Sequence, residues 1–508
     1  MNSKQILYKI FFFLFLGHIV LYAGYKEPVH TQYGDSSAWE QSEGIAFGKD
    51  DFVYTVGYTD YNVGNFTNDI LIGKHYKNGD LNKTLQYSSA GESHDYGLAI
   101  ATDDDGYVYI AGTTKGILPS NDLSHTNTYE GGFDVFVSKF DSNLTHIWTH
   151  QYGGTADEYA YGIVIDQGVI YVTGHTTSDL NSETNSGSFD IFLLELNDSY
   201  TPIKTTLFGS EYSDKATSIA VDTQHNIYIS GYSRGSFDAN NNCIMAGNTT
   251  EDDALLIKVD NTNTQTSCYQ FGTSSDDYLR GIAFDTQNNL YLAGDTKGAL
   301  VANEHQGDAD IYLRKISNDL QNVLWTTQQG SDASDLGSSV VFDGSNNIMV
   351  VGDTLGTIVG DNVTGTGCNY LATYNDNGDI NTTKQYGLAS GANVFKVIMD
   401  DNNDMFVTGY TEGDLNNPSD TTTDKDYFMT YFEVEPCLAG QTYAQGTTYC
   451  IDRTTTAFQP YLPALRDGSD RLVQGTDASY TPATEDSLDL LPSSCEEYPQ
   501  GSDQCVAP

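Results

Sequence analysis

The chain has 508 residues, and its 69 acidic against 23 basic residues give a formal net charge of −46. Proteins that bind nucleic acids or anionic membranes do so with Lys and Arg, so this balance argues against both kinds of partner. Cations, or surfaces that carry them, are the partners that such a charge attracts, although acidity also serves simply to keep a secreted protein in solution.

The first 24 residues have the pattern of a secretory signal peptide. Lys4 and Lys9 supply positive charge, the apolar run IFFFLFLG begins at Ile10, and Ala23 offers a small residue at the cleavage site. The run is short for a membrane-spanning helix, and no later segment is apolar enough to be one. We therefore expect a secreted or cell-surface protein with no transmembrane segment; an uncleaved membrane anchor is the alternative.

One short pattern recurs seven times between residues 28 and 435. A stretch rich in Tyr, Phe and branched aliphatic residues ends each time in Gly, a variable residue, and Thr or Ser, which we call the GxT motif. The glycines of the motif are Gly57, Gly112, Gly174, Gly231, Gly294, Gly352 and Gly409. A nearly constant period of this size indicates that one supersecondary unit has been copied and stacked.

The fifth unit shows the strands of the repeat most clearly. Its expected strands cover residues 280–285, 290–294, 310–316 and 323–329, and the tight turn TQNN joins the first two. Short alternating runs that are bounded by Asn, Asp and Gly are typical of strands and hairpins. No stretch after the signal peptide holds a helical apolar period, so we expect helices to be nearly absent.

Seven copies of a four-stranded antiparallel unit predict an all-β fold, a seven-bladed β-propeller, because radial packing protects the strand edges that an open sheet would expose. The last unit ends after its third strand, at residues 427–434, without a fourth. Residues 28–34 (PVHTQYG) match the fourth-strand endings TKQYG and HQYG of other units. We therefore predict that this N-terminal strand completes the last blade and closes the ring.

Aspartates recur at two positions of the unit. One closes the first strand of six units, at Asp103, Asp166, Asp222, Asp285, Asp343 and Asp400. Another opens the third strand of six units, at Asp69, Asp134, Asp190, Asp253, Asp310 and Asp426, whereas the sixth unit has Cys368 there. Asp side chains accept backbone N–H bonds in tight turns and Gly tolerates unusual dihedral angles, so turn formation is the simplest role for both residue types.

Together these elements resemble the SBBP β-propeller repeat family. The shared pattern is G-I-A-x-D, then x-Y-x-x-G-x-T, then D-x-(F/Y)-(L/V)-x-K and W-T-x-x-x-G, and the resemblance covers about residues 28–435. The Lys of this pattern is present at Lys74, Lys139, Lys258 and Lys315, and other residues replace it in the remaining units. The resemblance implies a secreted or cell-surface propeller whose activity is unassigned, and it supplies no catalytic residues.

Seven cysteines fit an oxidising compartment. The expected disulfides are Cys243–Cys268, Cys437–Cys450 and Cys495–Cys505, and Cys368 is then the one cysteine without an expected partner. The tail, residues 436–508, loses the repeat and is rich in Thr, Pro, Ser and acidic residues. This composition predicts a small cysteine-bearing module that is partly flexible; it serves either to attach the propeller to a surface or partner, or as a solvated linker.

Calcium is the sharpest candidate for a bound cofactor. The residues that could hold it are Asp103, Asp105, Asp179, Asp190, Asp414 and Asp426, in one acidic hairpin and two loops between second and third strands. Calcium takes about six to eight oxygen ligands, which Asp and Asn in such loops can supply. None of these segments has the EF-hand spacing, and Asp and Asn are also the default residues of turns, so turn chemistry is the alternative. The spacing of His and Cys suggests no transition-metal site, and no nucleophile motif is present.

Aromatic residues in the expected loops offer contacts for a ligand. These residues are Trp39, Tyr61, Tyr129 and Tyr159. They could stack on sugar rings or pack against a protein partner, because Tyr and Trp join a large apolar face to a polar group. By contrast, Trp148 and Trp325 open fourth strands, and we expect them to pack between blades.

We therefore predict a secreted or cell-surface propeller that acts as a non-catalytic binding or structural module in adhesion or a matrix. Its protein or glycan ligand would bind the loops of one face. A calcium-dependent carbohydrate-binding protein is the first alternative, and sugar-stacking loop aromatics would favour it. A polysaccharide-acting enzyme is the second, and two buried carboxylates with shifted pKa values in the central channel would favour it.

Overall fold

The structure is a computed structural model. It describes residues 29–34, 38–60, 67–91, 93–121, 127–197, 201–237, 243–246, 251–261, 265–343, 347–358, 368–386, 392–412 and 425–432, and five short strands of the tail. The chain separates into two compact units, Met1–Glu435 and Pro436–Pro508. The predicted signal peptide, residues 1–24, lies outside the described residues.

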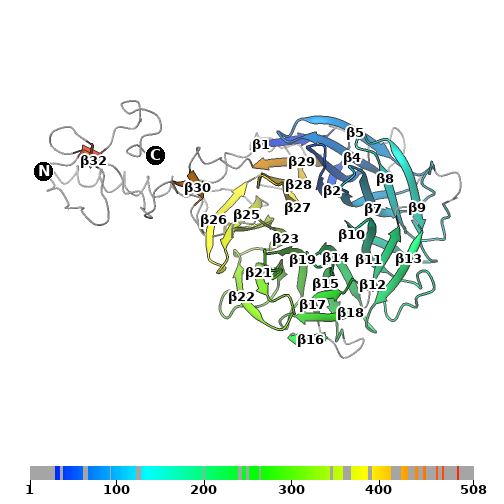
Figure 1. Cartoon of the computed structure of the whole chain (residues 1–508). Helices are drawn as coiled ribbons and strands as arrows, with labels where there is room; N and C mark the ends of the chain where they lie inside the picture. The colour runs from blue at the N-terminus through cyan, green and yellow to red at the C-terminus, as the bar shows by residue number, and fades with distance from the viewer. Residues whose placement is uncertain are drawn as a thin grey trace. The chain divides into compact units, whose positions relative to one another are not determined.

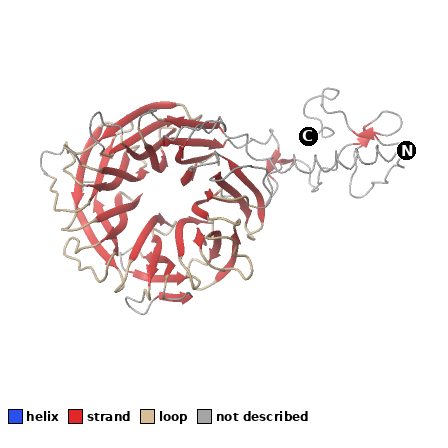
Figure 2. Cartoon of the chain, turned by 180° about the vertical axis from the view of Figure 1, so that it is seen from behind, coloured by secondary structure: helices blue, strands red, loops and turns tan. Residues whose placement is uncertain are grey.

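Every regular element of the described residues is a strand, as the sequence predicts (Figure 2). In the first unit these strands form seven sheets, which are the blades of a β-propeller (Figure 1). Blade 1 consists of β2 (Glu40–Phe47), β3 (Phe52–Thr59), β4 (Asp69–Tyr76) and β5 (Leu81–Tyr87). Blade 2 consists of β6 (Asp95–Thr102), β7 (Val108–Thr114), β8 (Asp134–Phe140) and β9 (His146–Tyr152). Blade 3 consists of β10 (Glu158–Asp166), β11 (Val169–Thr176), β12 (Asp190–Asn197) and β13 (Pro202–Phe208).

The remaining blades follow the same antiparallel plan. Blade 4 consists of β14 (Asp214–Val221), β15 (Ile227–Arg234), β17 (Asp252–Val259), β18 (Gln265–Phe271) and the added strand β16 (Cys243–Ala246). Blade 5 consists of β19 (Asp277–Phe284), β20 (Leu290–Thr296), β21 (Asp310–Ile316) and β22 (Val323–Gln329). Blade 6 consists of β23 (Asp335–Phe342), β24 (Asn347–Thr354), β25 (Cys368–Asn375) and β26 (Ile380–Tyr386). Blade 7 consists of β27 (Asn393–Met399), β28 (Met405–Glu412), β29 (Lys425–Phe432) and β1 (Val29–Tyr33).

The predicted closure by an N-terminal strand is confirmed. β1 pairs antiparallel with β29, with Val29 opposite Tyr431 and Tyr33 opposite Tyr427. Blade 1 also packs on blade 7, because β2 contacts β27, β28 and β29. An ion pair joins the same two blades, with Lys77 Nζ 2.7 Å from the buried carboxylate of Asp400. In Figure 1 the blue β1 lies beside the orange β29.

The hydrophobic core is divided among the interfaces between neighbouring blades. The cluster between blades 1 and 2, for example, joins Val56 and Ile72 to Val108 and Phe136. Each of the other six interfaces has a cluster of its own, including the one that joins blade 7 to blade 1. Because burial of apolar surface is the main favourable term in folding, each blade gains its stability from two neighbours and the ring must close.

The Lys of the repeat pattern fastens one blade to the next. Lys74 Nζ lies 2.6 Å from a carboxylate oxygen of Asp50 in its own blade and donates to the carbonyl of Ser142, in a hairpin of blade 2, at 2.7 Å. Lys315 pairs with a carboxylate of its own blade and also with Asp376 of blade 6. These half-buried charges are paired, which is the condition under which a protein interior tolerates them.

Both tryptophans that open fourth strands pack between blades, as predicted. Trp148 is buried in the cluster that joins blades 2 and 3. Trp325 packs against the cluster of blades 5 and 6, and its Nε1 donates to the carbonyl of Asp376 at 2.9 Å.

Five of the six aspartates that close first strands accept backbone N–H groups of the following turn, as predicted. Asp285 accepts the backbone N–H groups of Gln287 and Asn289 at 2.8 Å each. The same bonds, to the residues two and four positions further on, are formed by Asp103, Asp222 and Asp400, and Asp343 forms the second of them. Asp166 instead contacts the ring of His225, with its carboxylate 3.0 Å from Nδ1.

The strands of blade 5 largely match the predicted ranges. The third and fourth agree with them, the first covers Asp277–Phe284 where 280–285 was predicted, and the second extends to Thr296.

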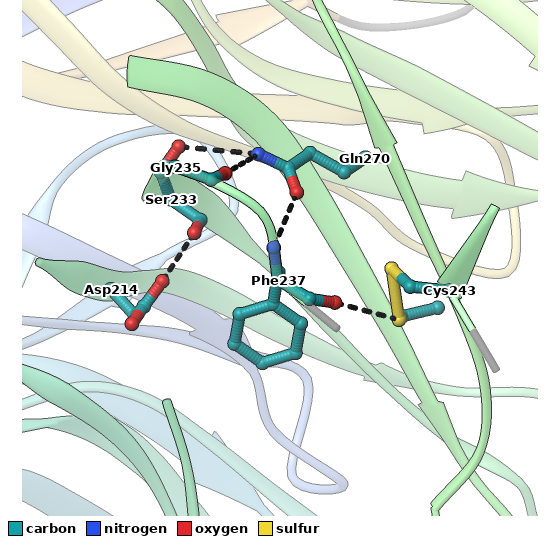
Figure 3. The surroundings of a disulfide bond; sticks show 7 residues. Asp214, Ser233, Gly235, Phe237, Cys243 and Gln270 are labelled. Atoms are coloured by element: carbon teal, nitrogen blue, oxygen red, sulfur yellow. Dashed lines mark hydrogen bonds between the residues drawn. A yellow bond between two sulfur atoms is a disulfide. The ribbon is translucent and has the colours of Figure 1, made fainter. Parts of the chain in front are cut away.

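Blade 4 departs from the four-stranded plan at its outer edge, where β16 pairs in parallel with β18. The predicted disulfide Cys243–Cys268 ties the two strands together (Figure 3). The buried amide of Gln270 fixes the loop that leads to β16, since its oxygen accepts from the Phe237 N–H at 2.9 Å and its nitrogen donates to the Gly235 carbonyl at 2.6 Å. β16 therefore covers a strand edge that would otherwise offer unpaired backbone groups.

The second unit contains short strands alone among its described residues. β30 (Gln441–Tyr443) pairs with β31 (Cys450–Asp452), and β32 (Leu465–Arg466) pairs with both β33 (Leu472–Val473) and β34 (Asp489–Leu490). Cys437, Cys495 and Cys505 lie outside the described residues, so the two disulfides expected in the tail stay predictions. Across the described part of the chain, no helix has the length and apolar character needed to cross a membrane.

Candidate functional site at the centre of the ring

Each GxT motif lies opposite a β-bulge in the first strand of its blade. In blade 1 the register passes from Ser42–Gly57 to Gly44–Val56, so Glu43 is the extra residue of the bulge. The same shift occurs at this place in all seven blades. The bulge brings the carbonyl oxygen of Gln41 so close to Gly57 that a Cβ would overlap it, and the other six GxT glycines are crowded in the same way.

This crowding explains why the GxT motif needs Gly. None of the seven has a positive φ, and all lie within strands. Turn geometry is therefore not the reason for Gly. The residue is needed because the bulged backbone approaches too closely for any side chain.

The Thr or Ser of the motif binds a buried acid at the start of the first strand. The pairs are Thr59–Glu40, Thr114–Asp95, Thr176–Glu158, Ser233–Asp214 and Thr354–Asp335. Figure 3 shows the bond from Ser233 to Asp214. These acids were not among the predicted site residues, although an acidic residue 16 or 17 positions before six of the seven GxT glycines was the signal that would have revealed them.

Buried carboxyl groups from neighbouring blades meet at this end of the ring. Asp253 opens the third strand of blade 4 and Asp277 the first strand of blade 5, and a Cβ on Gly272 would clash with both. Burial, together with the negative charge of Asp277, raises the pKa of Asp253 to about 7. Burial likewise raises the pKa of Asp134 to about 7, beside Glu158 of the next blade. These carboxyls are thus partly protonated at neutral pH.

The variable residue of the GxT motif contacts the first strand of the next blade in blades 1, 2, 4 and 6. The seven residues are Tyr58, Thr113, His175, Tyr232, Asp295, Asp353 and Tyr410. Tyr58 packs edge-on against Tyr96, and Tyr232 against Tyr278, with ring centroids 4.8 Å apart in each pair. Asp353 accepts the N–H of Val394 at 2.7 Å. First strands are the innermost strands of the propeller, so these residues surround the centre of the ring (Figure 1).

The bulges turn a second set of residues toward the same region. They are Glu43, Leu98, Tyr161, Thr217, Arg280, Ser338 and Phe395. Lys396 follows the bulge of blade 7, and its Nζ lies 3.4 Å from Ser218 Oγ of blade 4, so this contact crosses the ring. We call the charged and tyrosine residues of this region the central cluster: Glu43, Tyr58, Tyr161, Tyr232, Arg280, Asp295, Asp353, Lys396 and Tyr410.

One side of the central cluster is charged. Arg280 Nε and Nη2 both donate to the carboxylate of Asp295, the second at 3.4 Å. Burial opposes the charge of Arg280, but the Asp295 carboxylate outweighs it and raises the pKa of the guanidinium. The Arg280 side chain nevertheless keeps 36% of its surface exposed, so solvent reaches the site. Burial raises the pKa of Asp353 well above its ordinary value, which favours the neutral acid.

Glu43 and Lys396 form a second, looser pair of opposite charges. Burial raises the pKa of Glu43 to about 7, although the hydrogen bond from Gln41 and the charge of Lys396 both lower it. Burial lowers the pKa of Lys396 to about 8, and Glu43 partly offsets this effect. Lys396 forms no ion pair with any described residue, so its ammonium group is held by a single hydroxyl, that of Ser218.

The other side of the central cluster consists of tyrosines. Burial raises the pKa values of Tyr58, Tyr161, Tyr232 and Tyr410, so their hydroxyls stay protonated. Within the described part of the chain these four hydroxyls form no hydrogen bond, and none of them is a buried atom. They are therefore available, as donors and acceptors, to whatever occupies the centre of the ring.

The aspartates predicted to hold calcium that lie within the described residues are not gathered in one site. Asp103 and Asp105 lie in a hairpin between first and second strands, whereas Asp179 and Asp190 lie at the opposite, GxT end of their blade. Asp179 accepts the N–H of Asn185, and Asp190 that of Ser186. The described residues contain no group of three or more His, Cys, Asp or Glu that could hold a metal ion. Asp426 binds the Gln32 amide, and Asp414 lies outside the described residues, so calcium binding stays a prediction.

The predicted loop aromatics have different environments. Trp39 is 56% exposed, and the Lys425 ammonium lies 5.4 Å from its ring and 4.2 Å from that of Tyr410. Tyr129 is exposed, but its hydroxyl is bound to the carbonyl of Gly132 within its own loop. Tyr159 does not lie in a loop: it belongs to β10 and packs beside Tyr161, with ring centroids 6.4 Å apart. Tyr61 lies outside the described residues.

Comparison with known proteins finds distant structural likenesses and a repeat family. Among solved structures, a protein of unknown function from Dyadobacter fermentans is 12% identical, with a TM-score of 0.45 over 81% of this chain and 99% of that chain. A catalytically inactive virginiamycin B lyase from Staphylococcus aureus, solved with quinupristin, is 11% identical, with a TM-score of 0.44 over 80% and 99%. Drosophila plexin A in complex with semaphorin 1b is 9% identical, with a TM-score of 0.42 over 89% and 96%.

These similarities are too low to bear on function. No curated protein matches the chain. Three segments, residues 83–119, 203–238 and 269–300, match the model of the SBBP beta-propeller repeat. The protein is therefore a seven-bladed propeller that contains SBBP beta-propeller repeats.

Proposed function

We propose that the protein is a secreted or cell-surface binding module that holds its ligand over the central cluster, at the GxT end of the ring. The ligand is a glycan or a segment of an extracellular protein, and the propeller acts without catalysis, in adhesion or in a matrix. The GxT end also carries the loops between second and third strands, which differ in length from blade to blade.

One observation carries this proposal. The seven blades keep the residues that build the fold, namely the Gly and the Thr or Ser of the motif, but differ at the positions that face the centre of the ring. The bulge residue is Glu43 in one blade, Leu98 in the next and Arg280 in another. A residue needed only for packing would have similar surroundings in each blade, so we would expect the same residue type at that position in all seven blades. Varied polar and aromatic residues that solvent can reach are typical of a ligand site.

Residues around the central cluster extend this surface. Trp39 and Lys425 adjoin it at Tyr410, on blade 7. On blades 2 and 3, Phe133 packs between Tyr96 and Tyr159, at centroid distances of 5.9 and 5.3 Å. A ligand longer than the central cluster would therefore meet aromatic faces on two sides.

Glycan and extracellular-peptide arrays, probed with the full mature chain in calcium and again in chelator, test the proposal. We expect binding that is lost in a Tyr161→Ala/Tyr232→Ala variant and kept in a Tyr76→Ala variant, because Tyr76 is exposed at the end of β4 that lies away from the GxT motif. Loss of binding in chelator would support the predicted calcium dependence. Binding that survives the first variant and fails in the second would overturn the proposed site.

A polysaccharide-acting enzyme is the second candidate, and one observation favours it. Glu43 and Asp353 are two carboxyl groups at the centre of the ring whose pKa values burial raises. Glycoside hydrolysis uses one protonated and one ionised carboxyl group, which such shifts can provide. Release of reducing ends from any polysaccharide bound on the array, abolished by Glu43→Gln, would replace the binding proposal with this one.

A further inference from the structure

We propose that the central cluster binds the carboxylate of an acidic saccharide, a uronic acid unit whose ring lies against the tyrosines. The inference rests on the proposed function, because it names the ligand class for the same site. Its basis is a surplus of hydrogen-bond donors at the centre of a protein that is strongly acidic elsewhere.

One cation of the central cluster, Lys396, has no ion-pair partner among the described residues. Arg280 is matched by Asp295, and Asp353 favours its neutral form. Lys396 has Ser218 as its single bonding partner among the described residues, and Glu43 is not within ion-pair distance of it. Taking an ammonium group out of bulk water is costly unless it is paired, so an anionic group from a ligand would be stabilised there.

The neighbouring groups are also donors. The hydroxyls of Tyr58, Tyr161 and Tyr410 are protonated and have no partner in the described residues, and each of the three rings lies within electrostatic reach of Glu43. A protonated Asp353 would add a further O–H. Donors that converge on one region favour a ligand with acceptor oxygens, and a carboxylate accepts several hydrogen bonds at once.

The tyrosines favour a saccharide over a simple anion. A tyrosine presents a flat apolar face and a hydroxyl, which match the C–H face and the hydroxyl groups of a sugar ring. Tyr58 and Tyr232, each edge-on to a tyrosine of the next blade, place such side chains on two sides of the ring. The net charge of −46 repels anions at long range, but at physiological salt this repulsion is screened beyond roughly 8 Å. The hydrogen-bond donors of the central cluster therefore determine whether an anion binds there.

Calorimetric titration of the full mature chain at pH 7 and physiological salt tests the inference. The probes are short oligomers of galacturonic, glucuronic and mannuronic acid, each compared with its methyl ester, which keeps the sugar and removes the charge. We expect at least one acid to bind ten-fold or more tightly than its ester. Lys396→Met should abolish this preference and Lys396→Arg should keep most of it, with thermal unfolding confirming that both variants fold.

The possible failures are distinguishable. Equal binding of acid and ester would overturn the role of the carboxylate, and an undiminished preference in Lys396→Met would overturn its placement. If no uronic acid oligomer binds while an array ligand is lost in Tyr161→Ala/Tyr232→Ala, the saccharide class is wrong and the proposed function stands. If no uronic acid oligomer binds and the array ligand binds that variant as tightly as the wild type, both proposals fail.

Discussion

The carbonyl oxygen of Gln41 occupies the space that a side chain on Gly57 would fill, because a bulge at Glu43 pushes the first strand of blade 1 against the second. The relationship recurs at all seven GxT motifs. Bulges re-aim side chains. The most regular feature of the sequence therefore marks the place where each blade turns a residue of its own toward the centre of the ring.

Replacing Gly57 with Ala should destabilise the propeller strongly. The new methyl group would meet backbone atoms on the facing strand, which cannot rotate away, so we expect a loss of about 3 kcal/mol, the upper range for overpacking. Gly106→Ala is the matched control: Gly106 has a φ of +84° with open space around it, so strain alone should cost about 1 kcal/mol. Denaturant unfolding compares the two variants. A Gly57→Ala protein as stable as the control would contradict the crowding.

Deleting Val29–Tyr33 should weaken the ring without removing any whole blade. β1 pairs along its full length with β29, and at about 1 kcal/mol for each backbone hydrogen bond the loss amounts to a few kcal/mol. A synthetic peptide of residues 28–34 should bind the deleted protein and raise its unfolding temperature. A peptide with the same residues in scrambled order is the control, and an equal effect of both peptides would argue against closure by this strand.

The stability contributed by Asp253 should fall as the pH rises. Its pKa is about 7 in the folded protein against an ordinary value of 3.8, so its favourable contribution is complete below about pH 4 and is lost as the pH rises through about 7. Asp253→Asn should therefore stabilise the protein at pH 8, and this gain should shrink toward pH 5. Thermal unfolding at both pH values measures the difference between variant and wild type.

Comparison with the wild type at each pH is essential, because other groups titrate in the same range. Burial lowers the pKa values of His75 and His175 to about 3, so their contribution acts in the opposite direction and is lost as the pH falls below about 6.5. Asp105→Asn, which removes one negative charge from an exposed hairpin, is the control. A gain for Asp253→Asn that is the same at pH 5 and pH 8 would show that Asp253 titrates normally.

Removing the Cys243–Cys268 disulfide should destabilise blade 4. The cross-link closes a segment with a sequence separation of 25 residues, and a loop of this size contributes about 3 kcal/mol by restricting the unfolded chain. We expect Cys243→Ser/Cys268→Ser to lower the unfolding temperature and to free β16, which hydrogen exchange at residues 243–246 would detect. Addition of a reductant should affect the wild type far more than this variant; an equal effect on both would mean that another disulfide is responsible.

Much of the fold could be predicted from the sequence because short residue patterns specify its strands and turns. The motif NLYLAGDT, with its flanking Asn and Gly, predicted β20 and its hairpin, and the match between residues 28–34 and other fourth strands predicted the closure. The crowding at Gly57 could not be predicted in the same way. It depends on a bulge in the facing strand, and no particular residue type in the sequence marks the position of this bulge.

The candidate site was harder to predict than the fold. Glu43, Arg280 and Lys396 stand in three different blades and share no local pattern, so nothing before closure of the ring indicates that they meet. Attention to aromatic residues in loops missed Tyr161, which lies in a strand. The internal repeat did hold a usable signal: positions that vary among otherwise similar copies are the ones that the fold does not require.

Tyrosine footprinting in the presence of ligand tests the central claim most directly. Hydroxyl-radical labelling, with and without a ligand identified on the arrays, would be read out at the tyrosines of the central cluster and at exposed Tyr76, at the opposite end of blade 1. We predict protection of Tyr161 and Tyr410 and unchanged labelling of Tyr76. Protection of Tyr76, with the central tyrosines labelled as before, would show that the ligand binds elsewhere.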